Sequence, residues 1–541
     1  MKTPEFIISF TIQKSTLAGI QKWFEEHAVF LIVTVLSVLS IALWINYYQN
    51  GLGLAYNDAR SHLNIGRRVV EGLKPGLAQI GSVWLPLPHL LMVPTIWIDF
   101  FWHSGLSGAL VSMISFVATG VLIYQFLKQL GAGIFARIFG VAVFVLNLNI
   151  LYLQSTAMTE LLLLATMTAG AYYLMLWAKA DEIVNLIKAA LFIMLSTLIR
   201  YDGWFLVFFA TLLIALETFR KKGYRETEGK LILFVTLGGL GIGLWVLWNL
   251  LIFGDPLYFA FGPFSARAQQ TQLEAAGNLP TKGNLFLSFK LYYYALVYNS
   301  VAFNVIIGTL GAVAFWTSRK ISTSVKIASL ALIASLLFNV LALYLGHSVL
   351  FIQGLSGNTW FNVRYGIMLM PAIAVGAGYL VDRFKSFRWT IVGLFAFVIF
   401  FAFANGDAVT IDDARVGSSQ KNVTEVSGWL AENAAGREGF ILISAASHDA
   451  IIFSSGLPMK RFIHEGTGAY WEAATATSDR WARWIVMRTH DDNDLTWKAV
   501  SRTTGFQKYK LVDSYPFADI YQLKDEYLRD LNTKPIFGKQ K

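Results

Sequence analysis

The chain has 541 residues, of which 55% are apolar and 14% are charged. Soluble domains usually carry about a quarter charged residues, so this composition excludes an ordinary soluble enzyme and a disordered chain. The formal net charge is +10, which suits nucleic-acid binding only if the charge gathers on one face. The absence of cysteine excludes disulfides, thiol nucleophiles and cysteine-ligated zinc.

The charge is unevenly distributed along the chain. Residues 1–404 carry 27 basic and 16 acidic side chains, whereas residues 405–541 carry 17 and 18. The charge density of the second part is typical of a soluble domain. We therefore predict a membrane domain over residues 28–405 and a soluble α/β domain over residues 406–541.

The N-terminal residues 1–27 precede the first apolar run and are predicted to be cytoplasmic or interfacial. Residues 5–27 fit an interfacial amphipathic helix and a solvated cap equally well. They lack the short apolar core and small-residue cleavage site of a signal peptide.

The membrane domain is predicted to be mostly α-helical and polytopic, because a membrane helix needs about 20 apolar residues. Eleven runs satisfy or approach this length, namely 28–46, 107–127, 134–153, 157–178, 188–199, 203–218, 231–253, 291–316, 327–346, 364–381 and 389–405. The short runs 188–199 and 203–218 share a polar insert and fit either two crossings or a re-entrant pair. Within the long first loop, 47–105, we expect residues 84–101 to form irregular structure at the interface, with Trp and Phe as anchors.

The short loops fix the expected orientation, since Lys and Arg concentrate in cytoplasmic loops. With a cytoplasmic N-terminus, five loops place their basic residues inside: Lys128 with Arg137, Lys179 with Lys188, Arg220–Lys222 with Arg225, Arg319 and Lys320 with Lys326, and Arg383 with Lys385 and Arg388. This topology explains the basic surplus, so no nucleic-acid partner is expected. The prediction is a multi-pass plasma (inner) membrane protein with an extracytoplasmic C-terminal domain.

The polar side chains suited to chemistry fall mostly on the outer face. Asp58 follows the first span directly, and His62 lies four residues later on the same face of a predicted helix along the membrane. Shielding by membrane and loops would raise the pKa of such a carboxyl toward the range of a general base. The alternative is that Asn57 or Asp58 caps the helix, with a solvated Arg60.

A second group of polar residues interrupts the apolar runs. Glu160 lies one turn inside the fourth span. An acid at this position either faces a cavity or is a first-turn residue whose negative charge is stabilised by the helix dipole. Arg200 and Asp202 fit two interpretations equally well. They form an internal ion pair that lets the chain turn back, or Arg200 is a cation that binds an anionic head group.

Two further arginines are candidate phosphate ligands, because a guanidinium matches phosphate with paired hydrogen bonds. Arg267 lies in the loop 254–290, and Arg364 starts the tenth span. Either fits interfacial anchoring as well. The outer histidines and acids leave a divalent metal as an open possibility, although they lack a metal-ligand spacing.

Taken together, these features resemble the GT-C glycosyltransferases. The resemblance rests on the N-terminal span, an acid at the start of a long outer loop, a second acid near the fourth span, about eleven spans and an outer C-terminal domain. It is closest to the protein O-mannosyltransferase and lipid A aminoarabinose transferase branch. The segments 81–89 and 200–204 resemble uncharacterised prokaryotic members. The family's first loop usually has an acid pair before Arg, and here Asn57 replaces the first acid.

The resemblance implies an inverting transferase that moves a sugar from a polyprenyl-phosphate donor to a glycan, lipid or protein hydroxyl. Asp58 would be the base, and Glu160 would orient the acceptor or a metal. The remaining candidates, assigned to substrate binding, are Arg60, His62, Arg200, Asp202, Arg267 and Arg364. The Trp-Trp-Asp signature of oligosaccharyltransferases is absent, which disfavours transfer of a whole oligosaccharide to asparagine.

The C-terminal part alternates helix-like and strand-like segments. Helices are expected at 422–433, 448–454 and 494–503, and strands at 440–444, 484–488, 510–513 and 518–523. The segment Gly466–Trp471 fits a sugar-stacking loop or, more commonly, a buried tryptophan.

Two other function classes fit a polytopic chain. A transporter or lipid flippase needs broken helices near the midplane, often in repeated halves, and the sequence shows no repeat. A non-catalytic scaffold does not require Asp58, Arg60 and Glu160 to converge.

Overall fold

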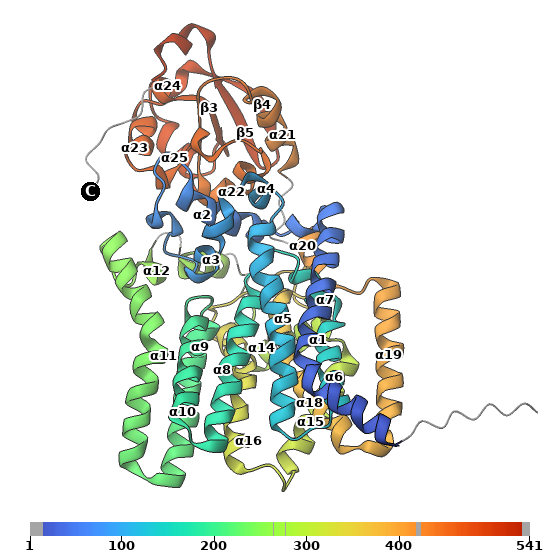
Figure 1. The fold of residues 1–541 in the computed structure, drawn as a ribbon. Helices are drawn as coiled ribbons and strands as arrows, with labels where there is room; N and C mark the ends of the chain where they lie inside the picture. Colours follow the sequence, from blue (N-terminus) through green and yellow to red (C-terminus); the bar gives the residue numbers. More distant parts are fainter. Residues whose placement is uncertain (1–13, 263–264, 276, 278, 418–422, 533–541) are drawn as a thin grey trace, which may run out of the picture.

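A helical bundle carries a small mixed α/β unit at one end (Figure 1). The computed structural model describes residues 14–262, 265–275, 277, 279–417 and 423–532. The predicted architecture, a polytopic helical domain with a small C-terminal α/β part, is confirmed.

Within the described ranges, eight helical segments are long and apolar enough to cross a membrane, which makes the chain a multi-pass membrane protein. Five are single helices: α1 (Lys14–Gln49), α5 (Leu106–Gln129), α8 (Glu160–Ala180), α10 (Asp202–Lys222) and α11 (Tyr224–Phe253). The others combine α16 (Thr323–Ser329) with α17 (Ala334–Tyr344), the 3₁₀ segment η4 (Val363–Leu369) with α18 (Met370–Arg383), and α19 (Arg388–Asn405) with α20 (Val409–Val416).

Three predicted spans take a different form. The run 134–153 divides into α6 (Ile134–Val145) and α7 (Leu148–Leu153), and 188–199 becomes the 15-residue α9 (Ile183–Thr197). The prediction of one helix over 291–316 is wrong. This run breaks into α14 (Leu285–Ser300) and α15 (Ala302–Thr317), bent by 106° at Val301, whose φ is 68°. A β-branched residue in this region is a clear outlier, so Val301 marks the point at which the helix is broken.

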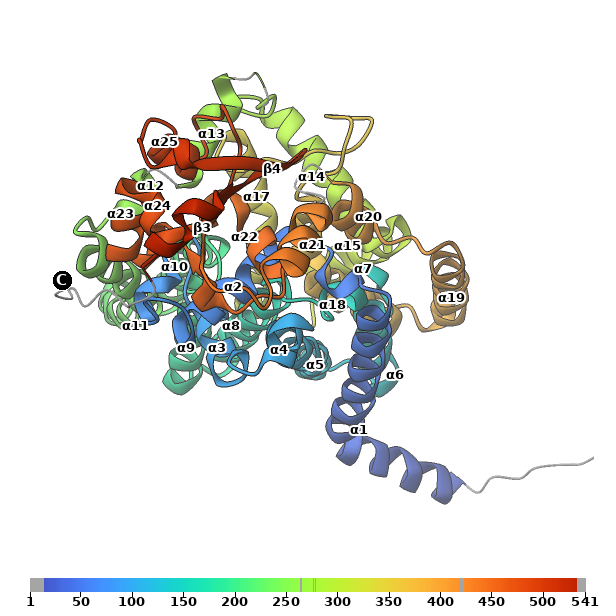
Figure 2. The same cartoon turned by 90° about the horizontal axis from the view of Figure 1, so that it is seen from above.

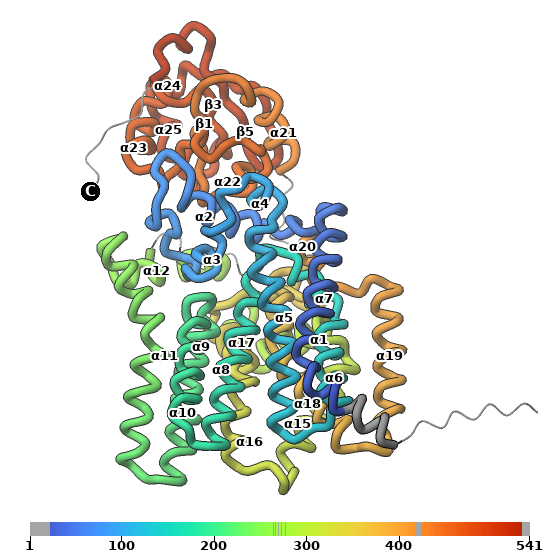
Figure 3. The backbone as a smooth tube through the Cα atoms, in the orientation of Figure 1, coloured from blue at the N-terminus to red at the C-terminus, as the bar shows by residue number. Residues whose placement is uncertain are grey.

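The first loop folds into a helical layer between the bundle and the sheet (Figures 1 and 3). It contains α2 (Asn57–Val70), α3 (Leu87–Ile96) and α4 (Asp99–His103). The expectation of irregular structure over 84–101 is therefore wrong. Proline is tolerated in the first turn of a helix, and Pro88 lies there in α3.

The segment between α11 and α14 carries α12 (Tyr258–Phe261) and α13 (Ala266–Ala275). At the N-terminus, α1 begins at Lys14 and continues without a break into the first span, whereas residues 1–13 lie outside the described residues. The predicted boundary at residue 27, between the N-terminal segment and the membrane domain, is therefore not a break in secondary structure.

The C-terminal unit is built on a five-stranded mixed sheet of order β2-β1-β3-β5-β4. The strands are β1 (Phe440–Ile443), β2 (Phe462–Ile463), β3 (Ala482–Met487), β4 (Tyr509–Tyr515) and β5 (Ala518–Leu523). β1 pairs in parallel with β2 and β3, whereas β5 pairs antiparallel with β3 and β4. The four predicted strands are present; β2 was not predicted.

Five helices accompany this sheet: α21 (Thr424–Asn433), α22 (Ala445–Ser454), α23 (Ala469–Ala476), α24 (Ser478–Trp481) and α25 (Leu495–Val500). The three predicted helices correspond to α21, α22 and α25, with shifted ends. Seen from above, α22 lies close to α2 (Figure 2). Arg68 of α2 forms an ion pair with Asp449 of α22 at 2.8 Å, and Asn64 donates to the same carboxylate at 2.9 Å.

Close backbone contact holds η4 against α14. A Cβ atom at Gly366 would lie 2.2 Å from the carbonyl oxygen of Ala295. Gly366 follows Arg364 by two residues, so this contact sets the position of the guanidinium-bearing segment relative to α14.

We predict that Gly366→Ala destabilises the protein by about 1–3 kcal/mol, because the added methyl group overpacks a backbone contact. The measurement is the thermal unfolding midpoint in detergent, which should fall. The control is Gly393→Ala in α19, where nothing lies within 4 Å of the added Cβ. There alanine should leave the midpoint unchanged or raise it, because it favours helix over glycine. An equal effect of both substitutions would contradict the prediction.

Candidate active site

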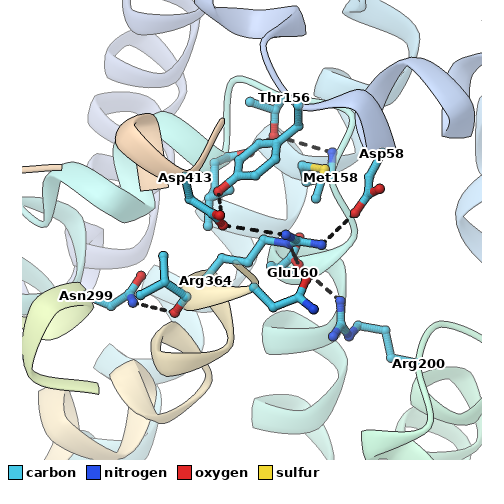
Figure 4. A network of polar contacts seen from close by, with 12 residues as sticks. Asp58, Thr156, Met158, Glu160, Arg200, Asn299, Arg364 and Asp413 are labelled. Carbon is cyan, nitrogen blue, oxygen red and sulfur yellow. Dashed lines mark hydrogen bonds and ion pairs between the residues drawn. The ribbon is translucent and has the colours of Figure 1, made fainter. Parts of the chain in front are cut away.

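Arg364 lies at the centre of a buried group of carboxylates (Figure 4). Its Nη2 is 2.6 Å from Asp58 Oδ2, and its Nε is 2.9 Å from Glu160 Oε1. The third nitrogen, Nη1, is 3.7 Å from Asp413 Oδ2. All three nitrogens of the guanidinium therefore face carboxylates, each from a different helix.

A second guanidinium, that of Arg200, extends this group. Its Nη1 donates to Glu160 Oε1 at 3.0 Å, and its Nε lies 3.5 Å from Asp202 Oδ2. Asn339 of α17 approaches the other oxygen of Asp202 at 3.4 Å. The internal Arg200–Asp202 pair, one of the two alternatives left open by the sequence, is thus present, and Arg200 also reaches the acid that Arg364 binds. One carboxylate oxygen of Glu160 bridges the two guanidinium groups.

Local structure explains how Glu160 reaches this position. It is the first residue of α8, and the turn before it is held by Ser112 of α5, whose hydroxyl lies 2.9 Å from the Thr156 carbonyl and 3.0 Å from that of Met158. Gly108 allows α5 to approach this turn, because a Cβ there would be 2.3 Å from the Cβ of Ala157. The acid therefore stands at a helix N-terminus, where the dipole favours negative charge.

Asp58 lies in the first turn of α2. The alternative that Asn57 or Asp58 caps this helix is wrong: the N-cap position is held by Tyr56, whose side chain makes no capping bond. The Asp58 side chain is 34% exposed, whereas those of Glu160 and Asp413 are fully buried. Asp58 is thus the member of the three that a bound molecule reaches.

Sequence reasoning missed two residues of this group, Asp413 and Tyr56. The Tyr56 hydroxyl donates to Asp413 Oδ2 at 3.0 Å, and its ring lies under the Arg364 guanidinium at 5.0 Å. Asp413 belongs to α20, which was assigned to the soluble part because it follows the last apolar run. The available signal was an acid pair, Asp412 and Asp413, a short distance after that run.

The other predicted residues lie differently. Arg60 donates to the Leu54 carbonyl at 2.9 Å, and Arg267 is exposed on α13, with its guanidinium 5.0 Å from the ring of Phe261. His62 is hydrogen-bonded to His89 at 2.9 Å and packs on Trp84. None of the contacts described for these three side chains joins them to the carboxylates around Arg364.

The surroundings of His62 give no sign of a metal site. Burial, followed by the charges of Arg364 and Arg200, lowers the pKa of His62 to about 3, so the ring is neutral at physiological pH. Within the described residues, no group of three or more His, Asp or Glu side chains has an arrangement that could hold a metal ion. The acids of the site face arginines instead.

The site combines four carboxylates, those of Asp58, Glu160, Asp202 and Asp413, with two guanidinium groups. Buried charges of this kind need partners, because removal from water costs several kcal/mol for each ion. A partly exposed carboxylate beside buried guanidinium groups can accept a proton from a bound hydroxyl, and the guanidinium groups can neutralise an anionic leaving group.

Comparison with known proteins identifies the fold. No protein-family model and no curated protein matches the sequence. Among solved structures, ArnT from Cupriavidus metallidurans bound to undecaprenyl phosphate has a TM-score of 0.56 at 12% identity, covering 91% of this chain and 98% of that chain. The same protein in the apo state has a TM-score of 0.55 at 12% identity and the same coverage. The archaeal oligosaccharyltransferase AglB from Archaeoglobus fulgidus has a TM-score of 0.46 at 12% identity, covering 86% of this chain and 70% of that chain. The chain therefore has the same overall fold as ArnT.

Proposed function

We propose that this protein is an inverting glycosyltransferase, which moves a sugar from a polyprenyl-phosphate-linked donor to an acceptor hydroxyl. The observation that carries the proposal is the convergence of Asp58, Glu160 and Arg200 around Arg364. The fold of ArnT, whose structure contains undecaprenyl phosphate, supports it.

The proposed reaction takes place at the end of the bundle that carries the sheet. The α10–α11 and α15–α16 connections, which carry basic clusters, lie at the opposite end (Figure 1). This arrangement supports the orientation expected from the sequence, with the reaction on the extracytoplasmic face of the plasma membrane. The domain boundary near residue 405 is proposed on the same basis.

The proposed chemistry is a single displacement. The acceptor oxygen forms a bond to the anomeric carbon while the bond from that carbon to the lipid phosphate oxygen breaks, which inverts the carbon. The Asp58 carboxylate takes the proton of the acceptor hydroxyl. Arg364 and Arg200 neutralise the charge that remains on the polyprenyl phosphate. Glu160 fixes both guanidinium groups.

Binding of the other substrate groups is proposed for His62, Asp202, Arg60 and Arg267. His62 lies within electrostatic reach of both central arginines, because their charges contribute to its lowered pKa. Arg60 and Arg267 stand outside the ion-pair group and fit contacts to parts of the substrate away from the reacting carbon.

An apolar cavity of about 570 Å³ between α6 and α19 is the proposed seat of the prenyl chain. Leu146 and Phe403 line it. Leu146 precedes Asn147, which donates to the Asn299 carbonyl at 2.7 Å; Asn299 in turn donates to the Val363 carbonyl at 2.7 Å, beside Arg364. Two asparagines thus link the backbone beside the cavity, by hydrogen bonds, to the segment that carries the central guanidinium.

The first test of this function replaces the base. Asp58→Asn should lower the rate of sugar transfer by about 10²–10⁴-fold, the usual contribution of a general base. The measurement is transfer from a radiolabelled polyprenyl-phosphate sugar in membranes, with a panel of donor sugars to find the substrate. Asp407→Asn, an exposed acid after α19, is the matched control and should retain full rate. Full activity of a folded Asp58→Asn enzyme would remove Asp58 from this role.

The second test fills the cavity. Ala396→Trp places a large ring among the cavity residues, whereas Leu394 is 50% exposed and does not line the cavity. We expect Ala396→Trp to raise the KM for a long-chain donor several-fold and to leave the KM for a donor with two isoprene units unchanged. Leu394→Trp should change neither KM. Equal effects on both donors would exclude the cavity as the seat of the chain.

A further inference from the structure

The carboxylates around Arg364 differ in how firmly they are held. Besides facing Arg364, Asp413 is held by Tyr56 and by the attachment of α20 to α7, which take no part in the proposed reaction. We propose that Asp413 is a positioning residue. With Tyr56 it keeps the Arg364 guanidinium in place while the phosphate of the donor lipid displaces Asp58 from Arg364. This inference rests on the proposed function, because it concerns the same lipid phosphate.

The solvent exposure of each carboxylate decides which one a phosphate can displace from Arg364. Asp58 is the partly exposed member of the three, and its contact with Arg364 runs from the outer end, Nη2, of the guanidinium. Glu160 and Asp413 are fully buried and approach Nε and Nη1. A phosphate entering from solvent therefore competes with Asp58 for Nη2, whereas the other two contacts remain covered.

Two sets of contacts fix the position of Asp413, one made by Tyr56 and one made by the helix that carries Asp413. The Tyr56 hydroxyl donates to Oδ2 at 3.0 Å, so this oxygen is shared between the phenol and Arg364. The helix α20 that carries Asp413 is fixed to α7: the amide and hydroxyl of Thr410 lie 3.0 Å and 2.8 Å from Asn149 Oδ1. Neither contact involves Asp58, so Asp413 stays in place when Asp58 moves.

Asp413 also has unused capacity to bind the guanidinium. Its Oδ1 is buried and has no hydrogen-bond partner within the described part of the chain, and the Nη1–Oδ2 separation of 3.7 Å is longer than a hydrogen bond. A buried acceptor without a partner is costly. A small shift of the guanidinium toward Asp413 is therefore favourable once Asp58 is released.

The exchange links donor binding to the availability of Asp58. While Asp58 pairs with Arg364, its Oδ2 is occupied by the guanidinium. When the phosphate takes Nη2, this oxygen is released and can meet the acceptor hydroxyl. Asp58 therefore becomes available after the donor is bound.

The test compares two variants that each remove one negative charge beside Arg364. The arrangement predicts that one variant raises the affinity for the lipid phosphate and the other lowers it. Binding of undecaprenyl phosphate to the full-length protein in detergent micelles is measured for the wild type and for three variants. Asp58→Asn should bind at least fivefold more tightly, because a competitor is removed. Asp413→Asn should bind at least tenfold more weakly, because Arg364 loses its anchor. Asp412→Asn, an exposed neighbour on α20, should stay within twofold.

If Asp413 acts only through its charge, Asp413→Asn will bind the phosphate more tightly, as Asp58→Asn does, and the inference is overturned. Unchanged binding by Asp413→Asn overturns it as well. If the wild type binds no undecaprenyl phosphate, it is the proposed function that fails. Binding by the wild type together with no effect at Asp413 leaves that function intact and rejects only the positioning role.

Tyr56→Phe separates positioning from general destabilisation. It should weaken binding in the wild type and have little further effect in Asp413→Asn, because the two side chains act as one unit. The thermal midpoint is recorded for each variant. Additive effects of the two substitutions, or affinity losses that follow the midpoint alone, would overturn the role of Asp413.

Discussion

The guanidinium of Arg364 requires several carboxylates around it, because a cation removed from water at this depth is stable only when its donors are satisfied. It receives Asp58, Glu160 and Asp413 from three helices that lie far apart in the sequence. The bend between α14 and α15, the close approach at Gly366 and the attachment of α20 to α7 all bear on the placement of this one side chain or its partners.

The same constraint explains why the site is asymmetric. Glu160 and Asp202 are held within the bundle by Arg200 and Arg364, whereas Asp58 lies in the helical layer between the bundle and the sheet and remains partly exposed. Buried acids fix the cations, and an exposed acid is left to meet a ligand. This division of roles follows from burial rather than from residue type, since all four are carboxylates.

Much of this arrangement was predictable from the sequence. Apolar runs located the helices, and acids or arginines at the outer ends of those runs identified Asp58, Glu160, Arg200 and Arg364. Hydropathy could not identify Asp413, because its segment resembles the start of a soluble domain. Nor could it indicate the break at Val301, which lies within a continuous apolar run, or β2, whose two residues are too short to form a pattern. The proline-containing helix α3 was missed because proline was taken as evidence against helix. Pro88 lies in the first turn, which permits a proline, and Pro94 lies inside this short helix near its end.

The ion pair between Arg68 and Asp449 connects the sheet unit mechanically to the helix that carries Asp58. Arg68 and Asp58 belong to the same helix, ten residues and about 15 Å apart along its axis. A helix of this length behaves as a rod, so a tilt of the sheet unit on its contact with α2 moves the carboxylate at the other end of the rod. A movement of the sheet unit is therefore transmitted to Asp58 through the backbone of α2, although the two are not in direct contact.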